Sequence, residues 1–151
     1  REEFALDTDL QSDCQPLHGL VDAIVAACPD VRAMRDATRG GLATVLNEFA
    51  DSARVGIQLI EDQIPVDDAV KGLCELLGLD PLYLANEGKL VVVVPPESAD
   101  GVLAAMQAHP LGTASRIIGQ VTEGSRVSLK TGFGTERVID RLVGDQLPRI
   151  C

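Results

Sequence analysis

Cys151, the last residue of the chain, is the first candidate for chemistry, because its thiol and the terminal carboxylate share one carbon. Pro148 fixes its own backbone angle and favours an extended Leu147, so a helical ending is not expected. An extended chain from Gly144 to Cys151 would reach roughly 25 Å from its last anchor. Such a tail could carry a thiol into a second site or into another protein. The alternative is a frayed terminus that happens to end in cysteine.

The sequence Asp-Ala-Thr-Arg-Gly-Gly, which precedes an amphipathic helix, is the second candidate. Gly40 and Gly41 would allow close backbone approach, and exposed amides at a helix start attract anions. Arg39 adds a planar donor fork that suits phosphate. Asp36 would hold a neighbouring arginine or help to coordinate magnesium bound to a nucleotide, and Thr38 is expected to cap the helix. The alternative is a tight turn in which Asp36 and Thr38 only cap.

Two carboxylates are candidates for a general base. Glu87 lies in an Asn-Glu-Gly sequence just before a strongly apolar stretch. It belongs either to a simple turn, with Gly88 at positive φ, or to a strand end that faces a cleft, where it would serve as a base. Glu48 is the second choice because it is polar on an otherwise apolar helix, and an ion pair or a solvated position is the expected role for it.

The remaining cysteines and histidines offer less. Cys28 and Cys74 fall on apolar faces of predicted helices, where buried thiols are common. Cys14 is expected to be a small buried residue or a helix-entry residue rather than a partner thiol for the terminal cysteine. His18 and His109 stand alone and are expected at the surface or in caps. With no Cys-x-x-C and no histidine at ligand spacing, no metal site is expected.

Hydrophobic periodicity predicts alternating helices and strands that give way to strands alone in the last third. Helices are expected at 16–28, with Pro16 at the start, at 39–53, from Asp67 to Gly78, and at 97–108. Strands are expected at 55–60, 89–94, 115–122, 126–130 and 136–142, with a short strand or loop at 31–35. The continuous apolar run of 89–94 indicates burial on both faces. The mixture predicts an α+β fold, a layered α/β sandwich.

Bulk properties exclude several classes of function. A length of 151 residues suits one domain with a sizeable core. The formal net charge of −10 argues against nucleic acid and anionic membrane surfaces, which need clustered Lys and Arg. No apolar run reaches membrane-spanning length and no secretory signal is visible. The isolated cysteines are typical of a reduced, cytoplasmic protein.

The domain boundaries follow from composition. The acidic, aperiodic stretch 1–11 is predicted to be a linker or a severed domain edge, 12–142 the α/β domain, and 143–151 a flexible tail that carries Cys151. Arg1 in place of an initiator methionine fits a fragment or a processed chain.

The glycine-rich run resembles the Asp-x-Thr-Arg-Gly-Gly signature of the PurM-like (aminoimidazole ribonucleotide synthetase) superfamily. With Pro-Arg-Ile-Cys as the last four residues, the resemblance narrows to the HypE family of hydrogenase maturation proteins. It runs along the chain from Ser12 to the end. The resemblance implies an α/β sandwich that forms the C-terminal domain of such a protein, without the ATP-binding domain that precedes it.

The resemblance also implies a reaction. The carbamoyltransferase HypF would place a carbamoyl group on Cys151, and ATP, with magnesium, would phosphorylate the carboxamide oxygen. Glu87 would remove protons, loss of phosphate would leave an S-cyanated cysteine, and cyanide would pass to iron on the HypC–HypD complex. The residues Asp36, Thr38, Arg39, Gly40 and Gly41 would form the phosphate side of the site.

Two further implications concern assembly and alternatives. HypE-like proteins would form homodimers chiefly through the missing domain, so this chain alone is expected to be monomeric and catalytically silent. One alternative is another PurM-like ATP-dependent synthetase, acting on thiamine phosphate or selenide, in which the terminal cysteine is incidental. The other is a binding module whose tail docks a partner through Leu147, Ile150 and Cys151.

Overall fold

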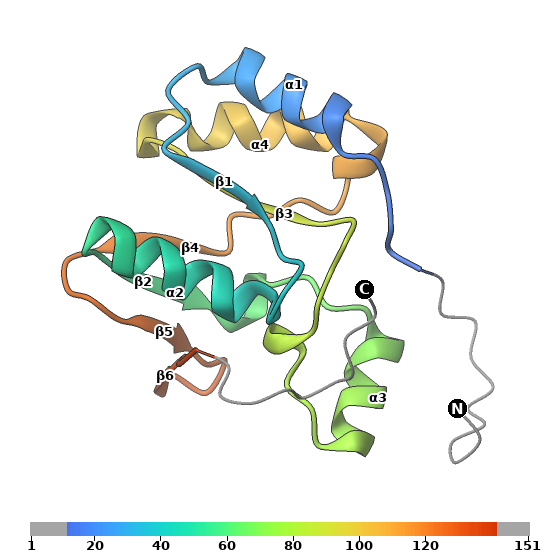
Figure 1. Cartoon of the computed structure of the whole chain (residues 1–151), viewed down its shortest axis with the longest axis vertical. Helices are drawn as coiled ribbons and strands as arrows, with labels where there is room; N and C mark the ends of the chain where they lie inside the picture. The colour runs from blue at the N-terminus through green and yellow to red at the C-terminus, as the bar shows by residue number, and fades with distance from the viewer. Residues whose placement is uncertain (1–11, 142–151) are drawn as a thin grey trace.

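A computed structural model describes residues 12–141 of the chain. Figure 1 shows helices and strands arranged as two small helix-covered sheets. Within this range the elements, in chain order, are α1 (His18–Ala27), β1 (Ala33–Asp36), α2 (Gly41–Ala53), β2 (Gly56–Ile60), α3 (Asp68–Leu77), β3 (Leu90–Val93), α4 (Ala99–Ala108), β4 (Gly119–Thr122), β5 (Val127–Lys130) and β6 (Glu136–Val138). The predicted α+β class is therefore confirmed, and no helix between residues 12 and 141 is long and apolar enough to cross a membrane.

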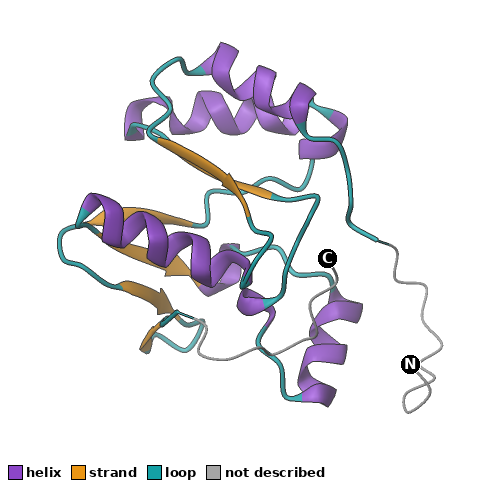
Figure 2. Cartoon of the chain, viewed as in Figure 1, coloured by secondary structure: helices purple, strands orange, loops and turns teal. Residues whose placement is uncertain are grey.

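The first sheet is an antiparallel ribbon of β1 and β3, covered on one face by α1 and α4. Figure 2 shows the two helices side by side above the ribbon. Their contact is formed by buried residues of both helices, among them Ile24, which is fully buried, and Val102. Cys28 is a buried member of this cluster, which confirms the prediction of a buried thiol at this position.

The second sheet has four strands in the order β4-β2-β5-β6. Strand β2 runs parallel to β5 and antiparallel to β4, and β6 is antiparallel to β5. Alternate residues of β2 and β5 point toward α2, where Leu59 and Leu129 meet Leu46 of the helix. The opposite face of the sheet therefore presents the intervening polar positions of the same strands.

Strand β3 connects the two hydrophobic clusters. Leu90 and Val92 contact the cluster under α1 and α4, whereas Val91 contacts the cluster under α2. This alternation explains why the strand is apolar at every position. All four of its residues are only half-buried, however, because the ribbon has two strands and leaves its edges uncovered. The predicted burial on both faces is therefore confirmed as packing against a cluster on each face, although the burial is only partial.

Element boundaries moved by a few residues from those predicted. The first helix begins at His18 with Leu17 as its N-cap, so Pro16 lies before the helix and not at its start. The last strand ends at Val138, because Ile139 turns inward into the core and is fully buried. Strand β4 begins only at Gly119, where pairing with β2 begins.

Candidate functional site

The antiparallel register of β1 and β3 brings the two predicted parts of the site to the same end of the ribbon. Asp36, the last residue of β1, is opposite Leu90, the first residue of β3. Beyond this pair the backbones remain bonded, since the Ala37 amide donates to the Lys89 carbonyl at 3.3 Å and the Asn86 amide donates to the Ala37 carbonyl at 2.9 Å. The glycine-rich run and the Asn-Glu-Gly loop are therefore neighbours, although about fifty residues separate them.

The start of α2 is formed by two glycines in the left-handed region. Gly40, the N-cap, has φ 67°, and Gly41 has φ 63°. A Cβ on Gly41 would lie 2.5 Å from the carbonyl oxygens of both Leu82 and Leu84. The prediction that Thr38 caps the helix is wrong, because the left-handed pair shifts the helix start beyond it, and its hydroxyl instead donates to Asp36 Oδ1 at 3.4 Å.

Two of the charged residues near this turn pair with each other. Arg35 forms an ion pair with Glu48 on α2. Glu48 therefore has the ion-pair role expected for the second-choice base, and of the alternatives for Asp36, the one in which it holds the neighbouring Arg35 is wrong. Arg39 and Asp36 are both exposed, and no bond links them within residues 12–141.

The start of α2 has an exposed cation and carboxylate beside it, but not the ligand set of a metal site held by protein alone. The first amides of an α-helix have no partner within the helix, and the exposed Arg39 beside them supplies a cation. Asp36 offers one exposed carboxylate at the same place. No cluster of three or more His, Cys, Asp or Glu side chains that could hold a metal occurs within the described part of the chain. A magnesium ion here would therefore rely mainly on phosphate and water ligands.

Glu87 is exposed and lies against the segment that precedes α1. Asp13 Oδ2 accepts a hydrogen bond from the Glu87 backbone amide at 3.2 Å and pairs with Lys89 Nζ at 3.3 Å. Residues 14–16 and Glu87 together line an open pocket of about 370 Å³. Cys14, one of these residues, is exposed, so the buried alternative is wrong, whereas its place just before α1 agrees with the alternative of a helix-entry residue. Cys14 and Glu87 therefore line the same space.

The other predicted cysteine and histidine roles agree with the structure. Cys74 is buried on α3, and this burial, with a smaller effect of the nearby Asp80 carboxylate, raises the pKa of its thiol. His109 caps the turn after α4, where its Nδ1 accepts a hydrogen bond from the Leu111 amide at 3.2 Å. His18 is exposed.

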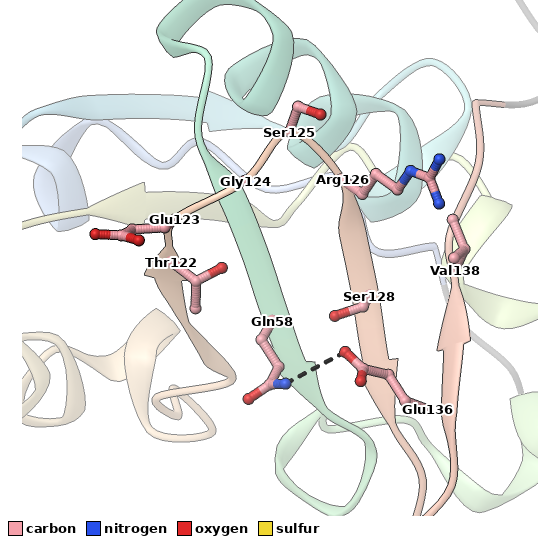
Figure 3. Close-up of a pocket in the computed structure, with 9 residues that line it drawn as sticks. All are labelled: Gln58, Thr122, Glu123, Gly124, Ser125, Arg126, Ser128, Glu136 and Val138. Carbon is pink, nitrogen blue, oxygen red and sulfur yellow. Dashed lines mark hydrogen bonds between the residues drawn. The ribbon is translucent and has the colours of Figure 1, made fainter.

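A second pocket, of about 630 Å³, opens on the face of the four-stranded sheet that α2 does not cover (Figure 3). Its charged lining residues are Glu123, Arg126 and Glu136. The pKa of the Glu136 carboxyl is lowered by hydrogen bonds to its side chain, the larger effect coming from Ser128 and the smaller from Gln58, whose Nε2 donates at 3.3 Å. Sequence reasoning missed this pocket, and the signal that could have found it is the alternation of polar residues along β2 and β5.

Cys151 and the tail 143–151 lie outside the described residues, as does the stretch 1–11, so these boundaries stay predictions. The segment just before the tail is firmly held. The carbonyl of the buried Ile139 accepts a hydrogen bond from Asn47 Nδ2 at 2.9 Å, and the carbonyl of Asp140 accepts one from the Tyr83 hydroxyl at 2.9 Å. Arg141 forms an ion pair with Asp51.

The geometry of the site can now be compared with known proteins. The sequence profile of the family described as AIR synthase related protein, C-terminal domain, matches residues 1–132. The chain belongs to this family. The predicted resemblance to the aminoimidazole ribonucleotide synthetase superfamily is thereby confirmed, and the glycine-rich run of this AIR synthase related domain is the left-handed turn that starts α2.

Relatives of this AIR synthase related domain narrow the comparison. It is 52% identical over 153 residues to Carbamoyl dehydratase HypE from Azotobacter vinelandii, an alignment that covers 100% of this chain and 45% of that protein. The HypE structure in complex with ATP matches with a TM-score of 0.88 and 40% identity, over 95% of this chain and 44% of that one. The structure of a HypE–HypF complex matches with a TM-score of 0.89 and 42% identity, over 93% and 46%. The chain thus spans about half the length of the relatives that it matches.

Proposed function

We propose that this chain is the C-terminal domain of an ATP-dependent carbamoyl dehydratase that acts on its own terminal cysteine. The observation that carries the proposal is the meeting of the Asp36–Gly41 turn and the Glu87 loop at one end of the β1–β3 ribbon. A helix start suited to phosphate and an exposed carboxylate therefore lie together. The similarity to Carbamoyl dehydratase HypE over the whole of this chain supports the same assignment.

The proposed reaction needs a carrier thiol, a general base and groups that bind phosphate. Cys151 carries the carbamoyl group as a thiocarboxamide, and ATP phosphorylates the carboxamide oxygen to turn it into a leaving group. Glu87 removes the N–H protons as phosphate departs, which leaves a thiocyanate on the sulfur, ADP and inorganic phosphate. The amides at the start of α2 and the Arg39 guanidinium stabilise the phosphate. Asp36 and Thr38 border this phosphate side.

The point where the tail begins lies close enough for the terminal thiol to reach Glu87 of the same chain. The segment 139–141 is held against the middle of α2, and residues 142–151, when extended, span at most about 33–36 Å. The distance along α2 from Asn47 to Gly41 is only about 9 Å. The terminal thiol can therefore reach the Glu87 end of the ribbon and can also extend to a partner protein.

The remaining components are proposed from the relatives. ATP with magnesium is the cofactor, in keeping with the HypE structure that contains ATP. The carbamoyl donor is the transferase HypF, in keeping with the HypE–HypF complex, and the acceptor of cyanide is iron on a HypC–HypD complex. A protein of the relatives' full length is proposed to act as a homodimer in the cytoplasm.

The test is an intact mass, with mapping of the terminal peptide, of a protein of the relatives' length that contains this domain. It is incubated with HypF, carbamoyl phosphate and ATP. We expect a carbamoyl adduct on Cys151, which ATP converts into a species lighter by one water. An unmodified tail in the presence of active HypF would overturn the proposal in favour of another PurM-like synthetase. If Cys151→Ser retains full function in hydrogenase maturation, a docking role for the tail replaces the carrier role.

A further inference from the structure

The segment before α1 is fastened across the loop that contains Glu87. Asp13 makes these contacts: its Oδ2 atom accepts hydrogen bonds from the Glu87 backbone amide at 3.2 Å and from the Lys89 ammonium at 3.3 Å. Hydrogen bonds to an ionised carboxylate are stronger than those between neutral groups. These contacts join residues 74 and 76 positions apart in sequence, so they fix the loop from outside its own strand.

A backbone contact fixes the same two segments a second time. A Cβ on Gly88 would lie 1.6 Å from the Asp13 carbonyl oxygen and 3.3 Å from the Gln15 backbone nitrogen. Only glycine leaves room for the segment 12–16, here called the strap, to lie directly on the loop. The carboxylate contact and the glycine contact therefore set one register between strap and loop.

The strap and the loop border an open space into which Glu87 is exposed. The pocket of about 370 Å³ has three strap residues, Cys14, Gln15 and Pro16, on one side and Glu87 on the other. Among the hydrogen bonds of residues 12–141, the one that involves Glu87 is made by its backbone amide to Asp13. The fold therefore controls the position of this carboxylate through the backbone.

We propose that Asp13 is a positioning residue for Glu87, the base of the proposed dehydration. This role rests on the proposed function. The Asp13 carboxylate touches no reacting atom; it holds the Glu87 backbone so that the side chain enters the pocket at a fixed place. Lys89 keeps the Asp13 carboxylate in position by pairing with the same oxygen.

The experiment measures single-turnover dehydration of S-carbamoylated protein of the relatives' length at saturating ATP. We expect Asp13→Ala to lower the rate about ten- to a hundredfold, as small misplacements of catalytic groups do, with the KM for ATP within about twofold of the parent value. Asp13→Asn keeps an oxygen that accepts a hydrogen bond from the Glu87 amide, so its dehydration rate should stay within about threefold of the parent rate. Gly88→Ala should slow the reaction like Asp13→Ala, because it displaces the strap.

Two further variants separate the possible failures. Asp30→Ala removes an exposed carboxylate that pairs with Arg32 at 2.8 Å, remote from the strap, and should leave the rate unchanged. Glu87→Gln should abolish dehydration while carbamoylation of Cys151 persists. An active Asp13→Ala beside an inactive Glu87→Gln would overturn the positioning role alone. A fully active Glu87→Gln would overturn the proposed base. If Asp13→Ala and Asp13→Asn lose activity equally, and both also have a lower melting temperature, Asp13 has only a structural role.

Discussion

Individual thiols in this domain differ in their surroundings. Cys14 is exposed on the strap, beside the space that Glu87 borders, whereas Cys28 and Cys74 are each 3% exposed. Burial and the nearby Asp80 carboxylate raise the pKa of the Cys74 thiol, so its reactive thiolate is scarce at neutral pH. Burial therefore makes the Cys74 thiol both less accessible to reagents and less ionised.

We predict that Cys14 reacts with iodoacetamide at least about a hundredfold faster than Cys74 in the folded domain, because only the exposed thiol is accessible to the reagent. Peptide mapping by mass spectrometry in a Cys151→Ser background gives the two rates separately. In denaturant the rates should converge. Equal labelling of Cys14 and Cys74 without denaturant would show that the α3 face opens, against the structure.

Glu136 shows how a carboxylate can be tuned at the surface. Its pKa is lowered by hydrogen bonds from Ser128 and Gln58 and by the positive charge of Lys130. A carboxyl whose folded pKa lies below its unfolded value stabilises the fold above the unfolded value, and this contribution is lost as pH falls through the folded value.

We therefore predict that Glu136→Gln lowers the urea midpoint slightly at about pH 7 and has no effect once the pH is below the lowered pKa of Glu136, where the parent carboxyl is protonated as well. Urea titrations across the acid range measure the difference. In a Ser128→Ala background, which lacks the first donor, the difference at neutral pH should shrink. A difference that stays constant with pH would contradict the assignment.

At the scale of elements, the glycine turn between β1 and α2 decides where the site residues lie. The left-handed backbone at Gly41 lets the start of α2 approach the carbonyls of Leu82 and Leu84 closely. The same approach sets the helix beside the chain that leads to Glu87. The turn is therefore a packing requirement as well as a possible phosphate site.

We predict that Gly41→Ala lowers the free energy of unfolding by about 2–5 kcal/mol, because the new Cβ meets two carbonyl oxygens and the backbone angle is strained. Gly72→Ala is the matched control, since Gly72 lies inside α3 with nothing within 4 Å of a Cβ. It should raise the free energy of unfolding by about 0.5–1 kcal/mol. Urea denaturation of both variants measures the contrast, and a neutral Gly41→Ala would argue against the close approach.

Local pattern predicted the elements well, and contacts between distant segments account for what it missed. The apolar face of α2 could be predicted from sequence because Leu46 and the other apolar residues of the helix repeat at helical spacing. The helix begins at Gly41, with Gly40 and not Thr38 as its N-cap, because Gly41 packs closely on the backbone of residues 82–84. Cys14 is exposed because the strap crosses Gly88, a pairing that no local pattern encodes. The pairing of Glu87 with the glycine turn likewise needed the β1–β3 register.

At the scale of the whole molecule, the chain spans about half the length of its relatives, and in the proposed function it supplies only part of the site. It contributes a phosphate-side helix start, a candidate base and the fixed origin of the tail, whereas its relatives are about twice as long. The formal charge of −10 opposes self-association at low salt, and the exposed apolar side chains, such as Phe133 on the β5–β6 turn, are scattered. In the proposed function the rest of the site comes from the other half of a protein of the relatives' length.

We predict that the 151-residue chain alone sediments as a monomer and releases no phosphate from ATP above background, because in the proposed function its helix start supplies only one side of the nucleotide site. Analytical ultracentrifugation and a phosphate-release assay, each at low and at physiological salt, provide the measurements. A protein of the relatives' length, carrying the same domain and supplied with HypF and carbamoyl phosphate, is the positive control. Phosphate release by the isolated chain that Gly41→Ala abolishes would place the nucleotide site within this domain and would contradict the division of the reaction between two halves.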